Sequence, residues 1–241
     1  MSGETILKID LLNRRDVLFG LGGLLVGFVL PGGRNAEAQR YGAPLPVKPN
    51  AYIHIDSDNI VTFVITKVEM GQGTVTSLSQ ILADELDCDW NCVRTEFAPV
   101  DPSSYGPMQG VFGSTSIRTQ WMPLRKAGAA ARQMLMEAAA QKWSIDVAQV
   151  RTEQGFLLAN GQSISYGSVA EAAAKLAVPA NIQLKDAKDF KLIGTPAKRL
   201  DTRDKISGAT KFGIDAEVPG MLYASLVRCP VFGGKVASYD A

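Results

Sequence analysis

The 241-residue sequence is poor in the side chains that usually bind metals or form disulfides: it has one histidine and three cysteines. Cys88 and Cys92 are four residues apart and could pair or bind something, but no further Cys or His lies nearby, so ordinary packing is favoured. Cys229 directly follows an apolar stretch, and we expect it in the core. His54 lies in the apolar run 51–55 and is expected to be structural. No iron–sulfur cysteine pattern is present.

An excess of one charge is also lacking, since 25 basic and 24 acidic residues leave a net charge of +1. There is no basic block, so nucleic acid is not an expected partner. Long hydrophobic runs are missing as well. The apolar run Val17–Leu30 is short and rich in glycine, so no integral membrane span is expected.

This short run has the features of a targeting segment. Arg14 and Arg15 precede it, and Ala36-Glu37-Ala38 offers a small-x-small cleavage site. Paired arginines before a weakly apolar run indicate the twin-arginine export route. We therefore predict a signal peptide over residues 1–38 and a periplasmic protein. Retention of the segment as an anchor, or a disordered tail with an incidental arginine pair, remain alternatives.

The hydrophobic periodicity predicts a mixed α+β fold without internal repeats. An extended lead-in over 39–49 precedes a domain over 50–176, and 177–198 is predicted to be a linker to a segment over 199–241. Strands are expected near 51–55, 59–66, 93–97, 150–152, 156–158, 164, 210–213 and 223–227, and helices near 76–86, 115–140 and 168–176.

Two glycine-containing turns are the candidate binding elements. Val68–Thr74 leads from a predicted strand into a helix, and Gln109–Ser116 opens the long helix that follows a loop. Glycines at a helix start allow backbone amides to face a ligand, and the helix adds positive potential. Two such turns suggest a ligand with several phosphate or pterin-like polar edges. Two unrelated structural turns are the alternative.

These motifs resemble the molybdenum hydroxylases of the xanthine dehydrogenase and aldehyde oxidase superfamily, most closely the large subunit of the isoquinoline 1-oxidoreductase type. The resemblance covers nearly the whole chain after residue 49. It rests on residues 69–73 (EMGQG), 81–86 (ILADEL), 113–116 (GSTS), 199–201 (RLD) and 219–223 (PGMLY). It implies that 50–176 is a molybdopterin-binding domain segment and that 199–241 begins an α/β hammerhead domain.

The resemblance also implies a site. It places Met70, Gly71, Gln72 and Gly73 against the pterin and its phosphate. The dinucleotide end of molybdopterin cytosine dinucleotide, the cofactor that carries the molybdenum, would lie against Gly113, Ser114, Thr115 and Ser116. Because a carboxylate beside an anionic cofactor is unfavourable, we expect Glu69 to orient its turn by hydrogen bonds.

The activity implied by the resemblance is hydroxylation of an N-heterocycle or oxidation of an aldehyde, with water as the oxygen source. The family's general-base glutamate has no counterpart before Ala241, so no catalytic residue is assigned, and we expect a subunit about three times longer. Electrons would pass to a separate 2Fe–2S subunit. A non-catalytic exported cofactor-binding or assembly module on the same scaffold is the alternative.

Overall fold

A computed structural model of the chain describes residues 24–28, 50–105 and 109–240. Apart from 24–28, the predicted signal segment lies outside the described residues, as does the predicted lead-in over 39–49. The chain divides into two compact units, Met1–Asp201 and Thr202–Ala241.

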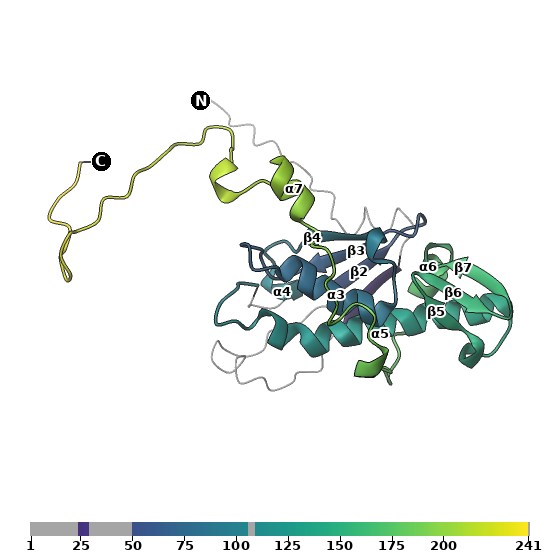
Figure 1. Cartoon of the computed structure of the whole chain (residues 1–241). Coiled ribbons are helices and arrows are strands. Elements are labelled where there is room, and N and C mark those ends of the chain that lie inside the picture. The colour runs from purple at the N-terminus through teal and green to yellow at the C-terminus, as the bar shows by residue number, and fades with distance from the viewer. Residues whose placement is uncertain (1–23, 29–49, 106–108, 241) are drawn as a thin grey trace, which may run out of the picture. The chain divides into compact units, whose positions relative to one another are not determined.

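The first unit is built on a four-stranded sheet with the strand order β1-β2-β3-β4 (Figure 1). β1 pairs antiparallel with β2 and β2 antiparallel with β3, whereas β3 pairs parallel with β4. A parallel pair requires a crossover, and α3 supplies it. The bounds are β1 Leu24–Phe28, β2 Asn50–Ile55, β3 Val61–Ile65, α3 Thr74–Leu86 and β4 Val93–Phe97. β1 lies within the apolar run of the predicted signal peptide.

Alternating burial along β3 shows which face of the sheet meets the core. Val61, Phe63 and Ile65 are buried, while Thr62 and Val64 between them are only partly buried. The buried residues join one hydrophobic cluster with the apolar faces of α3 and α5 (Ser116–Trp143). The two helices therefore cover one face of the sheet (Figure 1).

α3 and α5 approach each other closely at Gly128. A β-carbon on Gly128 would lie 2.6 Å from the carbonyl oxygen of Leu82 and 2.9 Å from Cβ of Glu85. Alanines fill most of the neighbouring buried positions of α5. These small residues explain why the long helix can lie so near to α3.

A second, three-stranded antiparallel sheet with the order β5-β6-β7 lies at the C-terminal end of α5 (Figure 1). Tyr166 fastens it to α3: its ring is fully buried, and its hydroxyl donates to the carbonyl of Leu86 at 2.8 Å. The bounds are β5 Arg151–Glu153, β6 Phe156–Ala159, β7 Gln162–Ser165 and α6 Gly167–Ala174. With a short helix, α4 (Pro102–Tyr105), in the loop between β4 and α5, the unit has the α+β architecture expected from the sequence.

The second unit differs from its predicted secondary structure. It contains α7 (Thr202–Ser207) and the 3-10 turn η4 (Gly213–Asp215). The strands predicted over 210–213 and 223–227 are absent from the described part of this unit, because no segment there pairs with them. Cys229 is exposed, so its predicted place in a core is wrong. Within the described ranges, no helix is long and apolar enough to cross a membrane.

Candidate functional site

The first candidate turn, Val68–Thr74, is organised around the carboxylate of Glu69. Its Oε1 accepts the backbone N–H groups of Gly71 and Gly73, both at 2.9 Å. Its Oε2 accepts the N–H of Val75 at 3.1 Å and the hydroxyl of Thr74 at 3.3 Å. This confirms the expected orienting role of Glu69. It also corrects the expectation for the glycine amides, since both donate within the turn instead of facing a ligand.

Arg199 balances the charge of this carboxylate. Its Nη2 lies 3.1 Å from Glu69 Oε1, and its Nη1 donates to the carbonyl of Gly71 at 3.2 Å. The Glu69 side chain is only 7% exposed, so a positive partner matters for its burial. Hydrogen bonding to Asp201 is the main cause that raises the pKa of Arg199 above its usual value. The turn therefore presents no unpaired negative charge.

The exposed tip of this turn is formed by Met70, Gly71 and Gln72. The Gln72 carboxamide closes the tip: its Oε1 accepts from the N–H of Met70 at 2.6 Å, and its Nε2 donates to the carbonyl of Val68 at 2.9 Å. Gly71 and Gly73 have φ angles of 104° and 87°, in the left-handed region that favours glycine. A β-carbon at either position would meet nothing within 4 Å.

The second candidate turn also contains two left-handed residues, Gly113 at φ 58° and Ser114 at φ 52°. Both are exposed, and Thr115 behind them is buried, with its hydroxyl bonded to the carbonyl of Phe112 at 2.8 Å. Ser116 is the first residue of α5. The turn thus presents one serine hydroxyl at its tip and a second at the start of the helix.

The structure brings the two turns to the same end of the α3–α5 pair. Lys67, directly before the first turn, donates from Nζ to the carbonyl of Gly110 at 3.2 Å, just before the second. At the other end, Asp87 follows α3 and accepts a hydrogen bond from Thr152 in β5 at 2.9 Å, and α5 ends beside the same sheet (Figure 1). Both helices therefore start near the two turns. That the turns hold one shared ligand stays a prediction.

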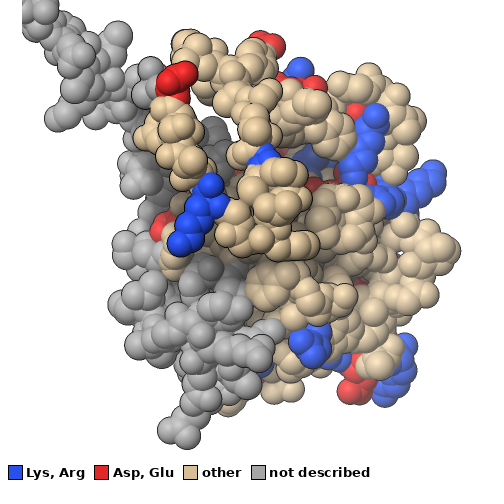
Figure 2. All heavy atoms as spheres, turned by 90° about the vertical axis from the view of Figure 1, so that its left-hand side faces the viewer, with Lys and Arg blue, Asp and Glu red and all other residues tan. Residues whose placement is uncertain are grey.

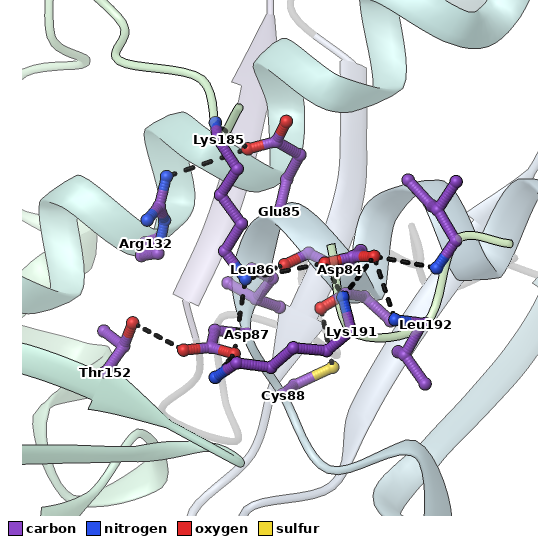
Figure 3. Close-up of polar contacts among 12 residues, drawn as sticks. Asp84, Glu85, Leu86, Asp87, Cys88, Arg132, Thr152, Lys185, Lys191 and Leu192 are labelled. Carbon is purple, nitrogen blue, oxygen red and sulfur yellow. Dashed lines mark hydrogen bonds and ion pairs between the residues drawn. The ribbon is translucent and has the colours of Figure 1, made fainter. Parts of the chain in front are cut away.

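At the C-terminal end of α3, three buried carboxylates, those of Asp84, Glu85 and Asp87, bond to the segment 185–193 (Figure 3). Asp84 accepts the backbone N–H groups of Lys191, Leu192 and Ile193 at 2.8–3.2 Å. The N–H of Lys185 donates to Glu85 at 3.1 Å. The stretch 177–198, predicted as a linker, is thus bonded to α3 within the first unit.

Positive side chains compensate these carboxylates. Glu85 binds Arg125 at 2.6 Å and has Arg132 at 3.7 Å. Burial acts to raise the pKa of Asp87, but the hydrogen bond from Lys191 and the charge of Lys185 outweigh it and hold that pKa below its usual value. This network supports the helix that leaves the first turn.

On the face drawn in Figure 2, the Lys and Arg atoms of the described residues lie in separate groups between uncharged ones. No cluster of His, Cys, Asp and Glu suited to a metal ion occurs in the described ranges. Burial raises the pKa of the Cys88 thiol far above its usual value, which disfavours the reactive thiolate form.

The residues of the two turns fit the dinucleotide cofactor that the resemblance implies. The first turn of each of α3 and α5 contains no acidic residue. The Glu69 carboxylate does lie against the start of α3, but it is paired with Arg199. The open space beside Gly71 and Gly73 allows close approach. Gln72, Ser114 and Ser116 offer uncharged polar groups. The contacts of two further residues, Arg199 and Lys67, are not recognisable from the sequence, because their partners lie 130 and 43 residues away. Residues 199–201 carry part of the resemblance, but as the start of the segment 199–241 and not as part of the first turn.

The chain is similar in sequence to a family of cofactor-binding domains and to several known oxidoreductases. Residues 13–216 match the family described as "Molybdopterin cofactor-binding domain". The beta subunit of isoquinoline 1-oxidoreductase from Brevundimonas diminuta is 31% identical, with 92% of this chain and 34% of that protein covered. Membrane-bound aldehyde dehydrogenase (pyrroloquinoline-quinone) of Gluconacetobacter polyoxogenes is 33% identical, with 95% and 31% covered.

A nicotinate dehydrogenase subunit from Pseudomonas putida is 30% identical, with 76% of this chain and 15% of that protein covered. Among solved structures, quinoline 2-oxidoreductase from Pseudomonas putida 86 aligns with a TM-score of 0.41 and 22% identity, over 50% of this chain and 15% of that one. The chain thus spans about a third or less of the length of these relatives.

Proposed function

The chain belongs to the family of molybdopterin cofactor-binding domains, and from this premise we propose that it is the N-terminal part of the molybdenum subunit of an exported oxidoreductase. One observation carries the assignment of the site: both glycine-containing turns lie at the shared N-terminal end of α3 and α5, joined through Lys67 and Gly110. A dinucleotide cofactor has two polar ends and can engage two such turns.

In this proposal the tip formed by Met70, Gly71 and Gln72, with Gly73 behind it, lies against the pterin and its phosphate. The segment Gly113–Ser116 holds the cytosine dinucleotide end through backbone and hydroxyl groups. When bound, the cofactor supplies oxidative hydroxylation with oxygen from water. The described residues of this chain bind and orient it.

The substrate and partner are proposed from the relatives. Their names include isoquinoline and nicotinate, which are N-heterocycles, and an aldehyde. We therefore propose an N-heterocycle or an aldehyde as the substrate class. Two of the relatives are named as subunits, which supports a separate partner subunit. We propose that this partner carries a 2Fe–2S cluster and accepts the electrons.

Export by the twin-arginine route is proposed from Arg14 and Arg15 together with the small-x-small site that ends at Ala38. Replacing both arginines by lysine should hold the precursor in the cytoplasm, as fractionation and the size of the product would show. Normal processing of that double variant would exclude this route.

The cofactor assignment is tested on the full-length subunit purified with its partner. We expect about one molybdenum, by elemental analysis, and one cytidine monophosphate, released by acid, per subunit. Protein without either would overturn the proposal. Cofactor-loaded protein that reduces no dye with isoquinoline or an aldehyde would favour the alternative, a non-catalytic exported binding or assembly module.

A further inference from the structure

One guanidinium group, that of Arg199, holds both the buried carboxylate and a backbone carbonyl of the first turn. Its Nη2 lies 3.1 Å from Glu69 Oε1, and its Nη1 donates to the Gly71 carbonyl at 3.2 Å. The same guanidinium donates from Nε and Nη2 to the two carboxylate oxygens of Asp201, both at 2.9 Å. Asp201 thus holds the guanidinium in place, and the guanidinium in turn bonds to the first turn.

The turn needs such a fixed charge because its shape depends on Glu69. This carboxylate accepts hydrogen bonds from the backbone amides of Gly71, Gly73 and Val75. Without it, the two glycines, which have left-handed conformations, would lose these hydrogen bonds. A carboxylate that is 7% exposed is costly to bury without a positive partner. Arg199 supplies a positive charge and at the same time bonds the backbone of the turn, so it acts on both the carboxylate and the loop that the carboxylate shapes.

We propose that Arg199, held by Asp201, is a positioning residue that keeps the turn 68–74 in its ligand-binding shape before the cofactor arrives. The inference rests on the proposed function, because it assigns that turn to the cofactor. Arg199 itself bonds to Glu69 and the Gly71 carbonyl, and it is not one of the residues of the exposed tip. Lysine would keep the charge but has no planar fork to reach Asp201, Glu69 and the carbonyl together.

The test is hydrogen–deuterium exchange of the full chain, read in peptides over 68–76, for Arg199→Lys against the parent. We expect exchange of these amides to rise about tenfold or more, as charge-assisted bonds that close the turn are lost. Exchange in the peptides of α5 over 124–140 should be unchanged. Arg203→Lys, at an exposed arginine close by in sequence, is the matched control and should alter neither.

Cofactor content then separates the two proposals. In the full-length subunit, Arg199→Lys should lower molybdenum and cytidine monophosphate content several-fold. Faster exchange with unchanged cofactor content would leave the positioning role intact and overturn the assignment of this turn to the cofactor. Unchanged exchange in 68–76 would overturn the positioning role. If Arg199→Lys does not fold, Asp201→Asn, which weakens the two hydrogen bonds that fix the guanidinium, is measured in its place by the same criteria.

Discussion

At the scale of single residues, the burial of His54 makes the stability of the protein depend on pH. This histidine lies on β2, opposite Thr62 of β3, and its Nε2 is buried without a hydrogen-bond partner among the described residues. Burial lowers its pKa, and the negative charges of Asp56 and Glu96 offset only part of that effect. The folded protein therefore prefers the neutral imidazole.

This preference predicts how stability depends on pH. The unfolded chain binds a proton near pH 6.5, whereas the folded chain binds it only at lower pH. The stability that the folded protein gains from a neutral His54 is thus fully present above pH 6.5, and it is lost as the pH falls through the lowered pKa of the folded state. Urea unfolding at pH 7.5 and 5.5 should show the parent losing stability at the lower pH and His54→Gln losing less. Since this is the only histidine of the chain, equal losses in both proteins would contradict the prediction.

Residue-level chemistry of the site is only partly predictable from the sequence. The role of Glu69 can be predicted because a carboxylate next to an anion site must be turned away from it, and the amides and the hydroxyl that donate to it lie within six residues. The ion pair with Arg199 spans 130 residues. Only tertiary structure decides such a pair, and no local pattern of the sequence encodes it.

At the scale of elements, local periodicity predicts the helices and strands where each element has a partner to pack on. β4 occupies the predicted residues 93–97, and α5 extends the predicted helix by a few residues. The apolar stretches near 210–213 and 223–227 have equally good strand patterns, but a strand also needs a neighbour for its backbone groups, and the described residues provide none. Apolar alternation predicts a capacity to pair, which is realised only beside another strand.

The close contact between α3 and α5 gives a prediction at this scale. Gly128→Leu would place a side chain where even a β-carbon meets the Leu82 carbonyl oxygen at 2.6 Å. Neighbouring backbone cannot move aside cheaply, so we expect a loss of roughly 1–3 kcal/mol or more in the free energy of unfolding, measured by urea titration. Lys126→Leu adds the same side chain at an exposed position of the same helix and should change stability by at most about 0.5 kcal/mol. An equal change in the free energy of unfolding for the two variants would mean that α3 and α5 do not pack through Gly128.

At the scale of the whole molecule, two turns about forty residues apart in sequence reach one end of a helix pair because both helices run from them toward the second sheet. The fold thereby turns two weak local motifs into one candidate site. Each motif alone is compatible with a plain structural turn. Their meeting, and the bond from Lys67 to Gly110, makes a shared ligand testable.

The test separates cofactor binding from backbone strain by comparing two glycines of similar conformation. Gly73 and Gly161 have φ angles of 87° and 76°, and a β-carbon at either would meet nothing within 4 Å. Gly161 lies in the turn between β6 and β7, at the second sheet. Gly73→Val and Gly161→Val should therefore both lose stability through the left-handed backbone, by roughly 1–2 kcal/mol.

Only Gly73→Val should also lower molybdenum and cytidine monophosphate content in the full-length subunit, because its side chain enters the space assigned to the cofactor. Ser114→Ala removes one hydroxyl from the second turn and should weaken retention less, by about 1 kcal/mol, or up to about 3 kcal/mol if the lost bond is to a charged group. Loss of cofactor in Gly161→Val to the same degree would trace the effect to stability. Full occupancy in both Gly73→Val and Ser114→Ala would remove the two turns from the site.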